Sequence, residues 1–172
     1  MDEIEIAPYD PDWPTAFERE RSRLAAATTD IDMLDLVHFG STAIANMPAK
    51  PIIDMLMIVS DLARARAVLP ERLDRLGYDF WAENPKTDRL FFVRGMPPRG
   101  ERRTHHLHVC EPGSEMHRRL AFLEYLNDHP EEAHSYAELK KGLAARYSKD
   151  REAYTRAKRA FVDRIIRLAG DA

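Results

Sequence analysis

Two short aliphatic segments joined by a Gly-Ser loop constrain the fold of this chain more than any other feature. Residues 34–39 and 52–59 are rich in aliphatic side chains and are bounded by Pro, Gly, Ser and Asp. Runs of this length and composition are typical of buried strands and too short for buried helices. We therefore expect both segments to lie inside a sheet.

The loop between these segments is suited to binding phosphate. Gly40 lets the backbone approach a ligand closely, and Ser41 and Thr42 offer hydroxyl and N–H groups that could cap a helical turn or hold a phosphate. Asp54 stands among aliphatic residues of the second segment, where an ionised carboxylate is costly unless a cation or several donors meet it. Asp54 is therefore a candidate site residue; the alternative is a structural acceptor for backbone N–H groups or an arginine.

A pair of histidines forms the second candidate site. Residues 104–110 are predicted to be a strand, in which alternation places His106 and His108 on one face and His105 and Leu107 on the other. Two imidazoles at this spacing can bind one metal ion, or act as general acid or base near neutral pH. The alternative is a pair of solvated or hydrogen-bonded histidines.

The remaining elements follow from apolar periodicity and from capping residues. We expect an edge strand at residues 4–6, helices at 14–28 and 61–77, and strands at 78–81 and 89–94. Three further helices are predicted at 114–126, 130–147 and 150–168. The 172 residues are thus predicted to form one domain, with an α/β sheet core in 1–112 and C-terminal helices in 113–172.

Two groups of basic residues allow two interpretations. The last third of the chain carries basic residues interleaved with acids, which indicate either a solvated surface or a basic patch that faces a ligand. They are Lys140, Lys141, Arg146, Lys149, Arg151, Arg156, Lys158 and Arg159. Arg89, Arg94, Arg102 and Arg103 flank two predicted strands and could converge on phosphate where open α/β sheets bind ligands. Alternatively, Arg89 and Arg94 pair with surface acids such as Asp88 and Glu83.

Composition excludes several classes of protein. The net charge of −3 argues against broad binding to nucleic-acid backbones, and Cys110 is the single cysteine, so an intrachain disulfide is excluded. No apolar run approaches the roughly 20 residues that span a bilayer. The acidic start lacks the features of a signal peptide, so we expect a cytoplasmic protein with no membrane partner.

Four sequence motifs stand out when the chain is read as a whole. They are His-x-Gly-Ser-Thr-Ala at 38–43, Ala-Lys-Pro-Ile-Ile-Asp at 49–54, Arg-Thr-His-His-Leu-His-Val at 103–109, and Leu-Ala-Phe-Leu-Glu-Tyr-Leu-x-x-His-Pro-Glu at 120–131. Together they closely resemble the GrpB family, a branch of the nucleotidyltransferase superfamily. Residues 9–14 and 154–162 match as well, so the resemblance covers almost the whole chain. It implies a nucleotidyltransferase-like mixed β-sheet flanked by helices, with a C-terminal helical segment. Some family members are fused to dephospho-coenzyme A kinase, which implies a link to coenzyme A metabolism.

The superfamily pattern is Gly-Ser followed by Asp-x-Asp, with a third carboxylate on a neighbouring strand. Gly40, Ser41 and Asp54 match this pattern, but Leu56 stands where the second carboxylate belongs. The third position falls in the strand of His106 and His108. A nearby departure is Asn46, which replaces a glycine of the relatives and tolerates the same left-handed backbone.

Two classes of function follow, both with a phosphorylated small molecule as partner. In the first, the chain is a nucleotidyltransferase-like enzyme that holds a nucleoside triphosphate. Its predicted ligand-binding residues are Gly40, Ser41, Thr42, Lys50, Arg89, Arg94 and Arg103, and its catalytic residues and metal ligands are Asp54, His106 and His108. Two nitrogens and one oxygen suit Mn²⁺ or Zn²⁺, whereas carboxylates would suit Mg²⁺.

In the second class, the chain binds a nucleotide or another phosphorylated ligand without catalysis, because it has lost the second metal carboxylate. A third interpretation is a scaffold protein in which Asp54 and the histidines form a structural polar network.

Overall fold

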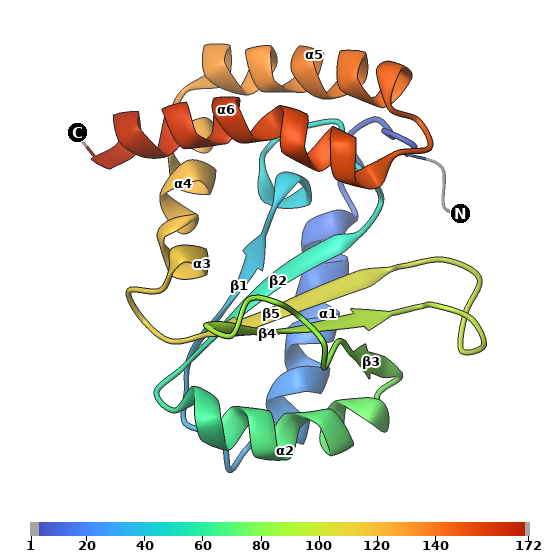
Figure 1. The fold of residues 1–172 in the computed structure, drawn as a ribbon, viewed down its shortest axis with the longest axis vertical. Coiled ribbons are helices and arrows are strands. Elements are labelled where there is room, and N and C mark those ends of the chain that lie inside the picture. Colours follow the sequence, from blue (N-terminus) through green and yellow to red (C-terminus); the bar gives the residue numbers. More distant parts are fainter. Residues whose placement is uncertain (1–3, 171–172) are drawn as a thin grey trace.

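A five-stranded mixed sheet forms the centre of the protein, which a computed structural model describes over residues 4–170 (Figure 1). The strands are β1 (Met33–Phe39), β2 (Ile53–Val59), β3 (Tyr78–Phe80), β4 (Arg89–Arg94) and β5 (His105–Cys110), in the order β1-β2-β5-β4-β3. β2 and β5 pair in parallel, and the other neighbouring pairs are antiparallel. The predicted mixed α/β fold with a C-terminal helical segment is confirmed.

Helices surround the sheet. They are α1 (Trp13–Ala27), α2 (Leu62–Asp74), α3 (Glu115–Arg118), α4 (Leu120–Asp128), α5 (Pro130–Arg146) and α6 (Arg151–Gly170), with a short 3₁₀ turn, η1 (Ser41–Ala43), after β1. None of the helices within 4–170 has both the length and the apolar character that crossing a membrane requires.

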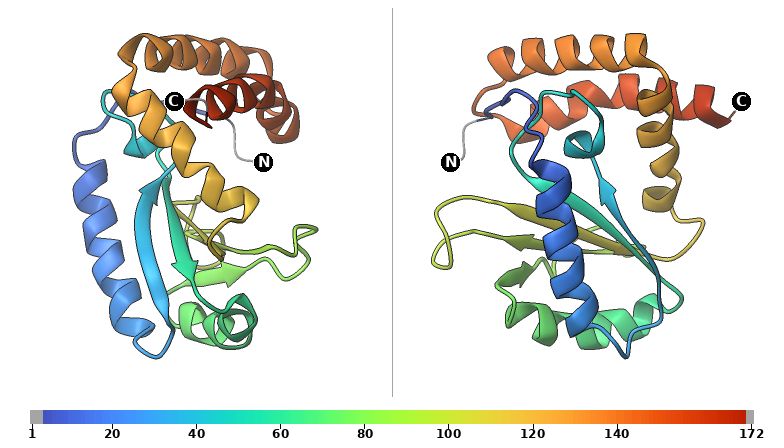
Figure 2. Two further views of the ribbon diagram at one scale, coloured as in Figure 1. Left: turned by 90° about the vertical axis from the view of Figure 1, so that its left-hand side faces the viewer. Right: turned by 180° about the vertical axis from the view of Figure 1, so that it is seen from behind.

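α1 and α2 cover one face of the sheet. Seen from behind in Figure 2, α1 lies across the strands and α2 along one end of the sheet. α1 begins at Trp13, one residue before the predicted start, and Pro14 lies in its first turn. The Asp61 side chain accepts the N–H of Arg64 to cap α2, as predicted. Leu24 of α1 and Leu69 of α2 are completely buried against the sheet, and each such leucine contributes about 1.5–3 kcal/mol.

The opposite face carries the predicted polar residues. The parallel register places Asp54 beside His106 and Leu56 beside His108, and residues paired in this way share a face. Leu107 points to the other face and is buried in the α1–α2 core. The prediction that His106 and His108 share a face is therefore confirmed.

The C-terminal helices are fixed to this second face and to the loop after β1. Met116 of α3 packs with Leu56 and other residues of the sheet, while α5 and α6 stack above one end of it (Figure 2). Ile44 and Met47, in the loop after β1, are buried with Ile165 of α6. This loop and the helices therefore hold one another in place.

β1 differs from the prediction because it is an edge strand. It pairs with β2 on one side, and its Leu34 side chain is 54% exposed. A register shift between Met33 and Asp35 marks an irregularity of the kind that discourages pairing at a sheet edge.

Two other segments differ from the prediction, and a third matches it. Residues 4–6 form no strand, because the Ile4 N–H donates to the carbonyl of Ser148. The helix predicted at 114–126 is divided at Arg119, whose N–H bonds the carbonyl of Met116 in a tighter turn. Asn46 has the predicted left-handed backbone, with φ 57°.

Candidate functional site

Gly40 brings the backbone after β1 against the carboxylate of Asp54. Its φ is 69° and its ψ is −167°, a conformation that residues with side chains rarely adopt. A Cβ atom at this position would also lie 2.7 Å from Oδ2 of Asp54. Gly40 and Asp54, both predicted site residues, therefore belong to one place in the fold.

Asp54 and His106 form a hydrogen-bonded pair across β2 and β5. Nδ1 of His106 lies 2.9 Å from Oδ1 of Asp54, although the two residues are 52 positions apart in sequence. Burial alone would raise the pKa of Asp54, but the hydrogen bond and the electrostatic attraction of His106, with smaller contributions from His108 and Lys158, outweigh burial and lower it. Asp54 is therefore a carboxylate at neutral pH.

The ionised Asp54 determines which nitrogen of His106 carries the proton. A carboxylate only accepts hydrogen bonds, so Nδ1 must be the donor. In the neutral imidazole, Nε2 then has a lone pair. Nε2 is buried, it has no hydrogen-bond partner among residues 4–170, and the ring lines a large cavity. His106 therefore holds an unpaired acceptor at the wall of the cavity, and a bound molecule reaches Nε2 only when the surrounding side chains shift to uncover it.

His108 lies one step further along β5 in apolar surroundings. Its ring stacks on Phe91, with ring centroids 4.7 Å apart, and burial lowers its pKa to about 4. Beside it, the fully buried Leu56 occupies the position of the second carboxylate. His108 is therefore neutral at physiological pH.

The described residues of this face do not supply the carboxylates of the two-metal arrangement that the superfamily pattern implies. Among residues 4–170, no group of three His, Cys, Asp or Glu side chains is arranged to hold an ion. Nδ1 of His106 is already bonded to Asp54, and Leu56 offers no ligand atom. A two-metal arrangement of carboxylates is thus missing from the described part of the chain.

Three lysines gather opposite the Asp54–His106 pair. The Nζ atoms of Lys50 and Lys158 each lie 4.5 Å from the ring centroid of Tyr154, and Nζ of Lys140 lies 5.0 Å from that of Tyr136. Burial is the main cause that lowers the lysine pKa values, to about 8 for Lys50 and Lys158 and about 7 for Lys140. The charges of neighbouring cations lower them further. The three lysines, named here the lysine cluster, form no ion pair with a carboxylate of residues 4–170.

One cavity of about 1040 Å³ joins the lysine cluster to Asp54, His106 and the Gly40–Ser41 turn. Its walls come from the sheet, from the loop after β1 and from α4, α5 and α6. The basic residues that line it are Lys50, Arg103, Arg119, Lys140, Arg151, Arg156, Lys158 and Arg159, against the acids Asp54, Glu152 and Asp163. The excess of positive charge favours an anionic ligand.

This cavity lies at the first residues of β2 and β5, where Asp54 and His106 are each the second residue of their strand. Open α/β sheets commonly bind ligands outside the carboxyl ends of their strands, so this cavity lies at the other end of β2 and β5. β1 runs antiparallel to β2, so Gly40, which follows the last residue of β1, lies at the same end of the sheet.

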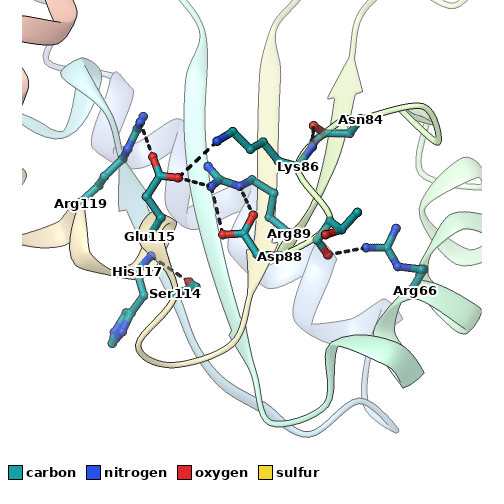
Figure 3. A network of polar contacts seen from close by, with 10 residues as sticks. Arg66, Asn84, Lys86, Asp88, Arg89, Ser114, Glu115, His117 and Arg119 are labelled. Carbon is teal, nitrogen blue, oxygen red and sulfur yellow. Dashed lines mark hydrogen bonds and ion pairs between the residues drawn. The ribbon is translucent and has the colours of Figure 1, made fainter.

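Arg89 is a predicted phosphate ligand that the structure places elsewhere. Its buried guanidinium lies between Asp88, 2.9 Å from Nε, and Glu115, 3.0 Å from one terminal nitrogen (Figure 3). Glu115 also accepts from Arg119 at 3.1 Å and lies 3.7 Å from Nζ of Lys86. Arg89 is therefore a structural residue, and through Glu115 it connects to Arg119, which does line the cavity.

Arg94 also lies away from the cavity, on the opposite face of the sheet. It donates to Glu20 of α1 at 2.8 Å, and the same buried carboxylate accepts from the hydroxyl of Tyr78 at 3.0 Å. Arg103 does line the cavity, whereas Arg102 lines a separate hollow of about 450 Å³ beside Arg94. The four arginines do not converge.

Of the eight basic residues predicted as a possible patch in the last third of the chain, five line the cavity. Lys140, Arg151, Arg156, Lys158 and Arg159 line the cavity, as the ligand-facing interpretation requires. The remaining three, which are Lys141, Arg146 and Lys149, are exposed and lie outside it.

Three residues that line the cavity were not predicted from the sequence as site residues. They are Tyr136 of α5, Tyr154 of α6 and Arg119, which lies between α3 and α4. The rings of Tyr136 and Tyr154 contact the lysine ammonium groups. Burial raises the pKa of Tyr136 to about 12, although a hydrogen bond with Ser41 acts in the opposite direction. A usable signal was present, because Arg151, Tyr154 and Lys158 recur at spacings of three and four on α6 and so share a helical face.

Comparison with known sequences establishes the family. Residues 3–168 match the family described as GrpB protein. The chain belongs to the GrpB family. The UPF0157 protein PA4798 of Pseudomonas aeruginosa is 48% identical to it over 166 residues, which are 96% of this chain and 67% of that protein.

Solved structures agree with this assignment. The GrpB protein of Enterococcus faecalis is 32% identical to this member of the family, with a TM-score of 0.85 over 96% of each chain. The Cid1 poly(U) polymerase is similar in fold, with a TM-score of 0.52 at 15% identity over 83% of this chain and 43% of that one. The GrpB fold is thus nucleotidyltransferase-like, as the sequence motifs imply.

Proposed function

We propose that the cavity binds a nucleotide or another phosphorylated small molecule, with its phosphates between the Gly40–Ser41 turn and the lysine cluster. The observation that carries this proposal is the placement of buried Lys140 and half-buried Lys50 and Lys158 in one cavity, without an ion-paired carboxylate among residues 4–170. Asp54 attracts Lys50 and Lys158 only through space.

A bound phosphate would lower the free-energy cost of holding three protonated lysines close together in the cavity. Buried like charges repel one another, and an ammonium held in apolar surroundings loses its proton more readily than one in water. A phosphate group brings several negative charges and acceptor oxygens, so it stabilises the protonated lysines by charge-assisted hydrogen bonds. Arg103 and Arg119 add planar donors that suit phosphate oxygens.

Group transfer is a second candidate function, favoured by the Asp54–His106 pair. An acceptor hydroxyl near Nε2 of His106 would lose its proton to that nitrogen while its oxygen forms a bond to phosphorus. The leaving phosphate or pyrophosphate would depart with the electron pair of the broken P–O bond. Asp54 would hold the ring and stabilise the imidazolium that forms. The buried Leu56 favours binding without catalysis, so we rank transfer second.

A thermal-shift screen tests the binding proposal. The probes are the common nucleoside triphosphates, inorganic tripolyphosphate and coenzyme A precursors, which the family fusions suggest. A ligand at 100 times its Kd stabilises the folded state by about 2.7 kcal/mol, so the midpoint of wild type should rise. Ser41→Ala combined with Lys50→Ala should remove the rise, whereas Lys141→Ala should keep it, because exposed Lys141 pairs with Glu138. Equal shifts in wild type and the double variant would refute the proposal.

Pyrophosphate release tests the second candidate. Turnover that persists with a metal chelator and disappears in His106→Gln would support transfer by the Asp54–His106 pair. Binding without turnover under all conditions would leave a non-catalytic binding domain.

Calorimetry with Mn²⁺, Zn²⁺ and Mg²⁺ tests the cofactor expectation separately. A metal site at Asp54, His106 and His108 would weaken in His106→Ala/His108→Ala. If the two proteins have the same affinity for each ion, these histidines are not metal ligands.

A further inference from the structure

The wall of the cavity opposite the lysine cluster is aromatic. Phe39, Trp81, Phe91 and Val93 line it, together with the ring of His108. Among residues 4–170, the large apolar side chains that are exposed are Leu34, Trp81 and Leu168, and of these Trp81 alone lines the cavity. A large indole that is 48% exposed inside a binding cavity indicates a contact surface for a ligand.

The indole of Trp81 is held in place without its surface being covered. The backbone N–H of Trp81 donates to the carbonyl of Phe91 at 3.0 Å, which continues the β3–β4 pairing beyond Phe80 and fixes the backbone that carries the indole. The two rings meet at 73° with centroids 6.1 Å apart, in an edge-to-face contact. Phe91 is itself fixed by stacking on His108. Trp81 is therefore a positioned aromatic surface beside the cavity.

Such a surface suits a planar ring. Planar aromatic rings stack on tryptophan through their faces, whereas inorganic phosphates have no such face. The cavity also has room for more than phosphate, since its volume is about 1040 Å³. A ligand that satisfies both walls carries phosphate at one end and an aromatic ring at the other.

We infer that the ligand is a nucleotide whose base stacks on the indole of Trp81 while its phosphates lie against the lysine cluster. This inference rests on the proposed binding of a phosphorylated ligand, and it narrows the substrate class from phosphorylated molecules in general to those with a planar base.

Tryptophan fluorescence reports directly on this contact. The chain has two tryptophans, and the second, Trp13, is buried in the core on the far face of the sheet. A nucleotide that stacks on Trp81 should therefore quench emission, while inorganic tripolyphosphate should bind without comparable quenching. Each of the four common nucleoside triphosphates is titrated, and the tightest is compared with tripolyphosphate.

Calorimetry of Trp81→Ala gives the decisive comparison. Base–aromatic stacking corresponds to about 5- to 150-fold in affinity, so the variant should lose at least 5-fold for the nucleotide and nothing for tripolyphosphate. Trp81→Phe should retain most of the affinity, and Leu34→Ala, which removes an exposed apolar side chain from β1, should bind like wild type. If nucleotide and tripolyphosphate bind equally and Trp81→Ala changes neither, the inference is wrong while phosphate binding stands. If neither probe binds wild type, the proposed function fails first.

Discussion

Replacing Lys140 by methionine should stabilise the unliganded protein. Lys140 is almost completely buried, and its pKa falls from 10.5 to about 7. Because one pKa unit corresponds to about 1.4 kcal/mol, holding this ammonium charged in the folded state costs on the order of 5 kcal/mol as an upper bound. The substitution also removes the 2.5 Å hydrogen bond from Nζ to the carbonyl of Pro48, and an unsatisfied carbonyl costs about 1–3 kcal/mol. The net gain should be about 2 kcal/mol, which raises the melting temperature by roughly 4 °C or more.

The stability gained in Lys140→Met should depend on pH, and the two pKa values of Lys140 give the direction of this dependence. The unfolded chain keeps the Lys140 proton up to about pH 10.5, whereas the folded chain releases it near pH 7. Between these values the unfolded state binds more protons, so the stability of wild type rises with pH. The cost of the charge is fully present below pH 7 and is relieved as the pH approaches 10.5. The advantage of Lys140→Met should therefore be largest near pH 6.5 and shrink towards pH 9.5.

Thermal unfolding of both proteins at pH 6.5 and 9.5 measures this difference. Lys141→Met is the matched control, since its exposed ammonium pairs with Glu138, and it should show no such gain. A lower melting temperature of Lys140→Met at both pH values would refute the reasoning, because Lys140 would then be a compensated structural lysine.

Other substitutions separate the site from the scaffold. Gly40→Ala should lower the free energy of unfolding by about 1–3 kcal/mol from backbone strain alone. It should also weaken triphosphate binding, because the new methyl group meets Asp54. An unchanged melting curve would contradict the Gly40 geometry. Arg94→Lys should lower the melting temperature of the unliganded protein without changing triphosphate affinity, because it disturbs the ion pair with Glu20. Arg103→Lys should do the reverse and weaken triphosphate binding at a nearly constant melting temperature, since lysine lacks the planar fork; calorimetry and thermal unfolding of both variants decide.

Local patterns in the sequence predicted much of the site. Strand alternation placed His106 and His108 on one face, and the Gly-Ser turn with a lone carboxylate identified Gly40 and Asp54. The tolerance of asparagine for a left-handed backbone predicted the conformation of Asn46. These features depend on a few neighbouring residues, so a sequence can reveal them.

The spacing of Arg89 and Arg94 in the sequence explains why their side chains do not converge. Arg89 and Arg94 are five positions apart in one strand, and an odd separation places two side chains on opposite faces. They could not both reach one phosphate from that strand. The pairing of Arg89 with the adjacent Asp88 agrees with the alternative interpretation. Glu115 and Glu20, the further partners of Arg89 and Arg94, come from elements distant in sequence, which propensity and alternation do not specify.

The lysine cluster was only partly predictable for a similar reason. Basic residues on α5 and α6 are as compatible with a solvated face as with a cavity, and the choice depends on how the helices pack over the sheet. That packing is fixed by buried contacts such as Ile44 with Ile165, which join the loop after β1 to the last helix. Pairing of β2 with β5 likewise brings Asp54 to His106 across 52 residues.

Proton uptake on binding tests the central claim most directly. Calorimetric titration of the wild type with a nucleoside triphosphate at pH 8, in two buffers of different ionisation enthalpy, counts the protons that accompany binding. Lys50 and Lys158, with pKa values of about 8, are half neutral at this pH, and Lys140, with a pKa of about 7, is largely neutral. The bound phosphates should cause these lysines to take up protons. We expect uptake of roughly one to two protons per ligand, reduced in Lys140→Met. Binding with no proton uptake, or no binding at millimolar ligand, would contradict the account of the lysine cluster as a phosphate site.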